Sequence, residues 1–236
     1  MEVMPYQPDR TADCGHDPRP HARPAPPAGE RRALPVLTAP DDAAAWQEGL
    51  PVLHGLRLTL RELHHDDAAT LFAELTTEEV TRFISPPPTS VRGFERFIAW
   101  AHRERAEGRY LCFAVVPEGQ DAPVGLFQIQ RHDVEGGVAE WGFVLGAPYW
   151  GRGLFLESAL LVLAFAFDTL GVRRLEARAC RENGRGTGAL RKLGAICERV
   201  LREAFVKDGR AHDQGLWVLT PAWWRRRIAP TTTAVH

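Results

Sequence analysis

The segment Gly151–Leu170 limits the possible folds of this chain more than any other part of the sequence. It is apolar almost all round, and its longest apolar run, Ala159–Phe167, is bounded by Glu157 and Asp168. A helix of this kind must be covered on several sides, which is typical of a helix that packs across a β-sheet. A membrane-spanning helix needs about 20 apolar residues. The segment therefore predicts a buried core helix and not a membrane span.

A turn rich in glycine precedes this helix and follows the strand-like run Gly137–Leu145. The first N–H groups of a helix have no partners within it, and they lie at the positive end of its dipole. Gly151 and Gly153 allow a tight turn and a close approach of an anion to the backbone. The turn can therefore bind a phosphate or pyrophosphate. The alternative is that the turn binds no anion and needs the two glycines only to connect the strand tightly to the helix.

Composition and charge exclude several classes of protein. Of the 236 residues, 44% are hydrophobic and 25% are charged, as in ordinary globular proteins. The 29 basic and 30 acidic residues give no electrostatic reason to expect a nucleic-acid or membrane-surface partner. The four cysteines form no CxxC pair, which excludes a disulfide scaffold and a standard zinc site and predicts reduced thiols in a cytoplasm. The chain starts without the apolar run of a signal peptide, so we expect a cytoplasmic protein.

The prolines are concentrated at the beginning of the chain. Nine of the 18 prolines lie in the first 40 residues, among arginine, aspartate and alanine and with hardly any periodic apolar pattern. Such a segment cannot bury enough apolar surface to offset the entropy that it loses on ordering. We therefore expect a disordered Pro/Arg-rich tail over residues 1–48, one folded domain over 49–228 and a flexible C-terminus over 229–236.

Hydrophobic periodicity predicts the elements of the folded part. Leu56–Arg61 alternates as a half-buried strand, and Asp66 or Asp67 can N-cap the helix that follows. Further predicted elements are helix 92–107, a meander of strands Tyr110–Val116, Pro123–Arg131 and Gly137–Leu145, strand Val172–Cys180, helix Gly186–Leu193, and strands Ile196–Val206 and Gly215–Thr220. This order predicts a mixed α/β fold with a mostly antiparallel sheet, some parallel pairing, and helices on both faces.

Several motifs occur together in the order and spacing of one enzyme family. They are Leu58-Thr59-Leu60-Arg61 with Asp66-Asp67-Ala68, Glu140-Trp141-Gly142-Phe143-Val144-Leu145, Tyr149-Trp150-Gly151-Arg152-Gly153 with Glu157, Asn183 with Lys192-Leu193-Gly194, and Asp213 with Leu216-Trp217-Val218-Leu219. On these residues, the chain from about Leu53 to Trp224 resembles a GNAT-fold N-acetyltransferase of the branch related to RimJ and RimL. The resemblance implies a GNAT acyl-CoA N-acyltransferase fold, in which two central parallel strands splay apart.

The resemblance also implies that acetyl-CoA is the co-substrate. Its pyrophosphate would lie on backbone amides of the glycine turn and the first helical residues. Its pantetheine arm would lie between the strands that end at Leu145 and Cys180, pairing like an added strand. A backbone N–H near Val144 would stabilise the oxyanion. The implied cofactor contacts are Phe143, Val144, Leu145, Trp150, Gly151, Arg152, Gly153, Leu154, Phe155 and Asn183.

Glu140 lies where related enzymes often have a glutamate that deprotonates the acceptor amine. The usual pKa is about 7.7–8.0 for an α-amine and about 10.4 for lysine. Either amine must therefore lose a proton, directly or through water, before it can attack. Alternation along the strand places Glu140 on the face of Gly142 and Val144, opposite Trp141. A cross-strand or helix-facing ion pair is the alternative explanation of this charged residue.

Three positions leave the details of the cofactor site open. Phe155 stands where the family usually has glycine or alanine, so its ring would crowd the phosphates unless it points into the core. Gly186 replaces a serine that often contacts the cofactor or protonates the leaving thiolate, so the general acid is unassigned. Asn183 is either a cofactor contact or an N-cap or turn residue.

We assign no cofactor-binding or metal-binding function to the remaining glycine and histidine motifs. Gly184-x-Gly186-x-Gly188 has its third glycine one residue too early for a dinucleotide fingerprint, and no βαβ series precedes it. His64-His65 and His212-Asp213 are interpreted as surface residues, and no metal is expected, because no HExxH motif or Cys/His cluster accompanies them.

The acceptor would enter opposite the cofactor, between the early helices and the final hairpin, where the candidate residues are Arg61, Arg82, Phe83 and Asp213.

Together these inferences predict an acetyl-CoA-dependent N-acetyltransferase in which an amine attacks the bound thioester directly, in a ternary complex. The acceptor is a protein N-terminal α-amine or a small-molecule amine, and neither nucleic acid nor membrane is a partner. We expect a monomer or a homodimer. The competing prediction is an acyl-CoA-binding sensor module without turnover, and it is based on Phe155 and Gly186.

Overall fold

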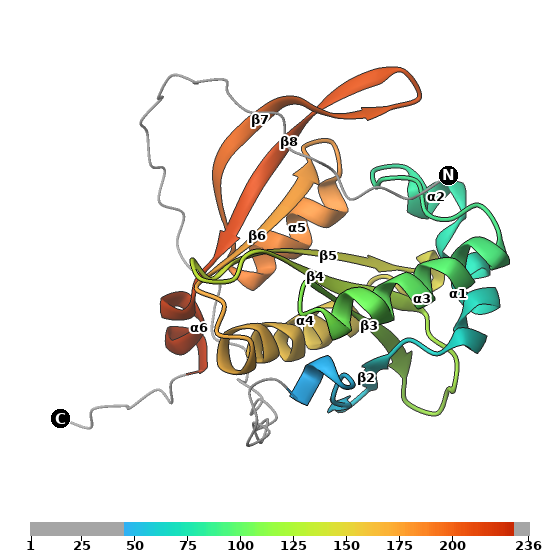
Figure 1. Ribbon diagram of the computed structural model, residues 1–236. Helices are drawn as coiled ribbons and strands as arrows, with labels where there is room; N and C mark the ends of the chain where they lie inside the picture. Colours follow the sequence, from blue (N-terminus) through green and yellow to red (C-terminus); the bar gives the residue numbers. More distant parts are fainter. Residues whose placement is uncertain (1–44, 229–236) are drawn as a thin grey trace.

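A single mixed sheet organises residues 45–228, the part of the chain that the computed structural model describes (Figure 1). The predicted tail over 1–44 and the flexible end over 229–236 lie outside these described residues. The strand order is β1-β2-β3-β4-β5-β6-β8-β7, and every neighbouring pair is antiparallel except β5 and β6. The predicted mostly antiparallel sheet is confirmed. The strands are β1 Leu53–His54, β2 Leu58–Glu62, β3 Tyr110–Pro117, β4 Gly125–Asp133, β5 Val138–Leu145, β6 Arg174–Cys180, β7 Ile196–Lys207 and β8 Arg210–Leu219.

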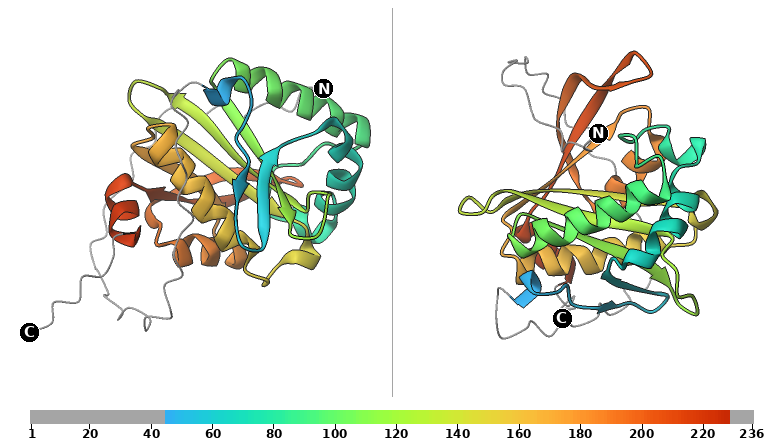
Figure 2. Two further views of the ribbon diagram at one scale, coloured as in Figure 1. Left: turned by 90° about the horizontal axis from the view of Figure 1, so that it is seen from below. Right: turned by 45° about the vertical axis from the view of Figure 1, so that its right-hand side comes forward.

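Helices cover both faces of this sheet, as predicted. Figure 1 and Figure 2 show α1 and α3 on one face and α4 on the other, while the β7–β8 hairpin projects beyond the rest of the sheet. Among the described helices, none combines the length and the apolar character needed to cross a membrane. The α-helices are α1 Ala68–Leu75, α2 Glu78–Thr81, α3 Val91–Ala106, α4 Leu154–Ala164, α5 Gly184–Leu193 and α6 Pro221–Ile228.

Each face of the sheet carries its own hydrophobic core. One core joins the sheet to α4 and α5, and the other joins the opposite face to α1 and α3. β3 is buried along its whole length, because its alternate side chains enter alternate cores. Leu111, Phe113 and Val115 enter the first core, and Cys112, Ala114 and Val116 enter the second.

The long apolar segment forms the central helix of the first core, as its composition predicts. α4 begins at Leu154, and after Ala164 the chain continues as a π-helix over Phe165–Thr169. The N–H of Leu170 donates to the carbonyl oxygen of Phe165 at 3.0 Å, which is the wider spacing of a π-turn. Leu161–Leu163 are at most 1% exposed. The helix is therefore covered on several sides, as a segment that is apolar all round requires.

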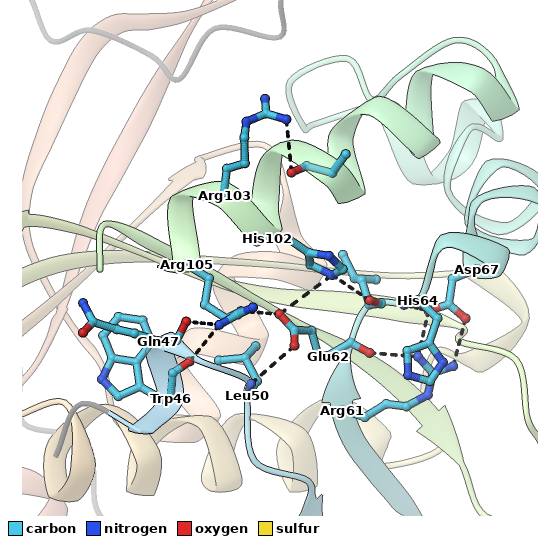
Figure 3. Close-up of polar contacts among 12 residues, drawn as sticks. Trp46, Gln47, Leu50, Arg61, Glu62, His64, Asp67, His102, Arg103 and Arg105 are labelled. Carbon is cyan, nitrogen blue, oxygen red and sulfur yellow. Dashed lines mark hydrogen bonds and ion pairs between the residues drawn. The ribbon is translucent and has the colours of Figure 1, made fainter. Parts of the chain in front are cut away.

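The described structure begins four residues before the predicted domain boundary. Ala45–Gln47 forms a turn of 3-10 helix, and Trp46 is only 3% exposed because it packs in the first core. Arg105 of α3 donates to the backbone carbonyl oxygen of Gln47 and to the carboxylate of Glu62 (Figure 3). One tryptophan among alanines has no periodicity, so the sequence pattern could not place these residues in the domain.

Asp67 is the N-cap residue of α1, one of the two predicted positions. Its side chain makes no capping hydrogen bond to that helix. Its two carboxylate oxygens instead accept hydrogen bonds from Arg61 at 2.7 and 2.8 Å (Figure 3). The N–H of His64 donates to the same carboxylate at 2.7 Å. Asp67 therefore ties β2 to the start of α1, and the predicted N-cap position is confirmed without a side-chain capping hydrogen bond.

Candidate active site

The strands β5 and β6 separate after a short parallel ladder. Its described pairs are Val138 with Arg174, Ala139 with Leu175 and Glu140 with Glu176. β5 then continues to Leu145 and β6 to Cys180, while the other edge of β5 stays paired with β4. We call residues 141–144 the open edge of β5, because their backbone groups that face β6 are available to an extended ligand. The predicted splay of the two central strands is confirmed.

The glycine turn at the end of β5 has the backbone conformation that its sequence requires. Gly151 has φ +73° and Gly153 has φ +81°, backbone angles that residues other than glycine rarely adopt. Gly153 is the N-cap of α4, and no side chain caps the first turn of this helix. A Cβ atom at Gly153 would lie 2.8 Å from the guanidinium of Arg57. The turn therefore needs glycine for its own geometry and also presents free N–H groups.

Arg57 and Glu157 fasten this turn to the segment before β2. The Arg57 guanidinium donates to the carbonyl oxygen of Arg152 at 3.0 Å and to the Glu157 carboxylate at 2.9 Å. The backbone N–H groups of Leu56 and Arg57 also donate to Glu157. Burial raises the pKa of the Glu157 carboxyl, but these hydrogen bonds outweigh burial and lower its pKa overall. Glu157 was noted in the sequence only as part of a motif, and its partner Arg57 gave no signal.

Trp150 connects the end of β5 to the start of α5. Its indole N–H donates to the carbonyl oxygen of Leu145 at 2.8 Å, so that carbonyl group is already occupied. The Arg185 guanidinium lies 3.9 Å from the centre of the Trp150 ring, and the Arg152 guanidinium lies 5.5 Å from that of Tyr149. Two positive charges thus flank the glycine turn. Sequence reasoning included Arg152 in the site but missed Arg185.

The ring of Phe155 points into the core. Its centre lies 4.6 Å from the ring of Phe143 and 5.8 Å from the ring of Phe127, and the latter pair is stacked. Phe155 therefore fills the space between α4 and the sheet and leaves the first turn of α4 open. The structure answers the question that the sequence left open at this position.

Asn183 is the N-cap residue of α5. Its Oδ1 atom accepts a hydrogen bond from the N–H of Gly186 at 2.8 Å, and its backbone carbonyl accepts from the Thr187 hydroxyl at 3.0 Å. The alternative interpretation as a helix cap is therefore confirmed. Oδ1 is engaged in the cap, and the NH₂ group is the part of this amide that can donate to a cofactor.

Glu140 lies at the last pair of the parallel ladder, where the two strands begin to separate. Its carboxylate accepts a hydrogen bond from Arg178 of β6, and His132 of β4 lies 3.4 Å away. The side chain of Glu140 is 25% exposed, so the group keeps access to solvent. The ion pair that the sequence left open as an alternative is therefore present.

A second carboxylate stands beside Glu140 on the parallel neighbour strand. Glu176 is paired with Glu140 in register, and Arg174 donates to Glu176 at 2.6 Å. The alternation of Arg174, Glu176 and Arg178 places all three side chains on one face of β6. This alternation was visible in the sequence, but only the parallel register brings the three charges to Glu140.

A hollow of about 960 Å³ lies between α2 and the turn that joins β7 to β8. Lys207 ties the two sides together, because its ammonium group donates to the carbonyl oxygen of Thr81. The lining is polar and carries more carboxylates than cations. Its residues are Thr76, Glu78, Glu79, Thr81, Arg82, Lys207 and Asp208.

One of the four predicted acceptor residues lines this hollow, and Phe83 is its neighbour in the chain. Arg82 lines the hollow, and its guanidinium lies 5.2 Å from the centre of the Phe83 ring. Arg61 instead holds Asp67, as described above. Asp213 accepts hydrogen bonds from Arg202 and from the N–H of Glu203, on a bulged part of β7. These two residues have structural partners and do not line the hollow.

Comparison with known proteins identifies the relatives of this site and fold. Residues 57–196 match the family model described as "Acetyltransferase (GNAT) domain". The chain is 29% identical over 165 residues to a Bacillus licheniformis protein named "Uncharacterized N-acetyltransferase p20". That match covers 70% of this chain and 93% of the relative.

Solved structures share the same fold. Mycobacterium smegmatis RimJ in complex with CoA-disulfide is similar with a TM-score of 0.68 and 20% identity, over 75% of this chain and 93% of RimJ. The microcin C7 self-immunity acetyltransferase MccE in complex with acetyl-CoA and AMP is similar with a TM-score of 0.63 and 18% identity. This second match covers 70% of this chain and 93% of MccE.

Proposed function

The chain belongs to the GNAT acetyltransferase family, and we propose that it transfers the acetyl group of acetyl-CoA to the nitrogen of a primary amine. Both substrates are bound at once, and the deprotonated amine attacks the thioester carbonyl carbon directly. The C–S bond then breaks, the acetyl group stays on nitrogen, and coenzyme A leaves as a thiolate that takes up a proton. The acceptor is a protein N-terminal α-amine or a small-molecule amine.

The observation that carries this proposal is an open strand edge that runs into an uncapped helix N-terminus. An extended pantetheine arm can pair with the open edge of β5, as a strand is added to a sheet. The pyrophosphate then reaches the N–H groups at Gly151–Phe155, where the helix dipole favours negative charge. An N–H of the open edge near Val144 stabilises the oxyanion that forms as the amine attacks. The NH₂ group of Asn183 is a further contact.

Glu140 is the residue that we propose to accept the proton of the ammonium, directly or through one water. It lies where β5 and β6 begin to separate, and it keeps access to solvent. Arg178 and His132 fix the position of its carboxylate. The hollow beside α2 is the proposed entry of the acceptor, since its excess of carboxylates attracts a cationic amine.

A Glu140→Gln variant tests the proposed base. We expect kcat to fall by about 10²–10⁴-fold. The rate profile should shift toward high pH, where the amine is already deprotonated, while acetyl-CoA binding stays unchanged. Glu176→Gln is the matched control, because it removes the neighbouring carboxylate at the same register. An unchanged rate and pH profile in Glu140→Gln would exclude Glu140 as the base.

The competing function is a sensor module without turnover, which was based on Phe155 and Gly186. The ring of Phe155 lies in the core, so only Gly186 still favours this alternative. Calorimetry with acetyl-CoA, followed by a thiol-release assay over a panel of peptides and small amines, separates the two functions. Binding with turnover supports the acetyltransferase, and binding without turnover on any amine supports the sensor. Absence of binding would contradict both.

A further inference from the structure

Three side chains of metal-binding type meet where β6 ends. The donor atoms of Cys180, Glu182 and His212 all lie within 4.8 Å of one another. The Cys180 thiol donates to Oε2 of Glu182 at 3.3 Å, and Nδ1 of His212 is hydrogen-bonded to the same oxygen. One carboxylate oxygen thus joins a thiol to an imidazole. The proposed reaction uses none of these three side chains.

Strand pairing and a turn explain why these residues meet. Cys180, the last residue of β6, pairs with Gln214 of β8, and the N–H of Arg181 donates to the carbonyl oxygen of Asp213 at 3.0 Å. Glu182 lies in the turn that follows β6, where the N–H of Asn183 donates to the carbonyl oxygen of Cys180 at 3.0 Å. This turn places the Glu182 carboxylate against the His212 ring of β8. The sequence shows only an isolated cysteine and histidine, and the antiparallel pairing brings them together.

The cluster has a buried floor and an open rim. Cys180 is 1% exposed, whereas the side chain of His212 is 23% exposed and that of Glu182 is 59% exposed. The ring centre of Phe205 lies 6.0 Å from that of His212. Burial therefore holds Cys180 in place, and an ion can enter past Glu182.

We propose that Cys180, Glu182 and His212 form a binding site for a divalent transition metal, with Zn²⁺ as the best match. Thiolate, imidazole and carboxylate are the three ligand types of protein zinc sites, and three protein ligands leave the fourth position to water. Mg²⁺ and Ca²⁺ prefer oxygen donors only, so the thiol and the imidazole disfavour them. This site lies beside the proposed cofactor contact Asn183, but the proposal does not depend on acetyl transfer.

The hydrogen-bonded arrangement is close to the one that the metal needs. Zinc–ligand bonds of about 2.0–2.3 Å place tetrahedral donors roughly 3–4 Å apart. The Cys180–Glu182 distance of 3.3 Å already lies in this range, and His212 has only to move outward from Glu182. On binding, the thiol proton is released to solvent and the metal replaces the hydrogen bonds that now join the three groups.

Titration of the full-length reduced chain with Co²⁺ tests the site, because a cobalt–thiolate bond gives a charge-transfer absorption band. Equilibrium dialysis then measures Zn²⁺ binding. We expect the band and one tightly bound Zn²⁺ per chain in the wild type. Cys180→Ala should lose the band, and His212→Ala should bind Zn²⁺ at least about tenfold more weakly. Circular dichroism shows whether each variant is folded, and the His212 variant is the safer of the two because His212 is partly exposed whereas Cys180 is buried.

Cys197→Ala is the matched control, since it removes a thiol outside the cluster. This variant should keep the band and the Zn²⁺ affinity of the wild type. The proposal is overturned if the wild type gives no cobalt–thiolate band. It is also overturned if folded His212→Ala binds Zn²⁺ as tightly as the wild type, or if Cys197→Ala is the variant that loses the band.

Discussion

At Glu157, one carboxylate joins the start of β2 to the first turn of α4. It accepts hydrogen bonds from the Arg57 side chain and from two backbone N–H groups, and its side chain is 16% exposed. Hydrogen bonds to a charged group contribute about 1.5–3 kcal/mol each at most sites of this kind. We expect Glu157→Gln to lower the free energy of unfolding by about 2 kcal/mol at neutral pH, as measured by urea denaturation.

The loss of stability in Glu157→Gln should depend on pH. The pKa of Glu157 is lower in the folded protein than its usual value of about 4.3. A lowered folded pKa stabilises the protein above the unfolded pKa, and this stabilisation is lost as the pH falls through the folded value. The difference between wild type and Glu157→Gln should therefore be constant above about pH 5 and shrink below it. A difference that grows at low pH would contradict the assignment.

A carboxylate in a more exposed ion pair is the control for this residue. Glu198 is paired with Arg174, and its side chain is 43% exposed. Exposed ion pairs contribute about 0–1 kcal/mol. Glu198→Gln should therefore change the free energy of unfolding by less than about 1 kcal/mol, although it also removes one carboxylate. An equal loss in both variants would show that burial of the Glu157 pair has no special effect.

At the scale of elements, the turn between β5 and α4 depends on the left-handed conformation of Gly153. With φ +81°, an alanine there is strained by about 1–2 kcal/mol, and its Cβ would also displace the Arg57 guanidinium. We expect Gly153→Ala to lower the free energy of unfolding by this amount and to weaken acetyl-CoA binding in calorimetry. Unchanged stability and binding would show that the turn tolerates a side chain.

Gly188 of α5 is the matched control for the glycine turn. A Cβ at this position meets nothing within 4 Å, and its backbone is helical. Alanine is favoured over glycine in a helix by roughly 0.5–1 kcal/mol. Gly188→Ala should therefore stabilise the protein slightly, so the two Gly→Ala changes should have opposite signs in the same denaturation assay.

At the scale of the whole molecule, residues 45–48 close the first hydrophobic core. Trp46 is 3% exposed, and the Arg105 guanidinium donates to the backbone carbonyl of Gln47. Removing a buried tryptophan costs about 3–5 kcal/mol. We expect a chain of residues 49–236 to be less stable by about this amount than a chain of residues 45–236, as measured by denaturation under identical conditions. Equal stability would show that Trp46 is not part of the cooperative core.

The elements that the sequence predicted are those whose signal is local. Strand-like runs separated by turns identified β3, β4 and β5, the apolar composition identified α4, and the glycines identified the turn at Gly151 and Gly153. Trp46 was placed outside the domain, and Asp67 was predicted as an N-cap residue but not as the partner of Arg61. The burial of Trp46 depends on a distant surface, and the partner of Asp67 lies on a neighbouring strand.

By itself, the sequence determined the mixed fold, the helix behind the glycine turn, and the position of Glu140 on its strand, because periodicity and backbone chemistry act between neighbours in the chain. Only the tertiary structure decided that β5 separates from β6 after Glu140, that Phe155 turns into the core, and that Arg57 holds the turn. It also brought Cys180 and His212 together across two strands. Strand register and side-chain packing join residues that are far apart in the sequence, and no local pattern records such pairs.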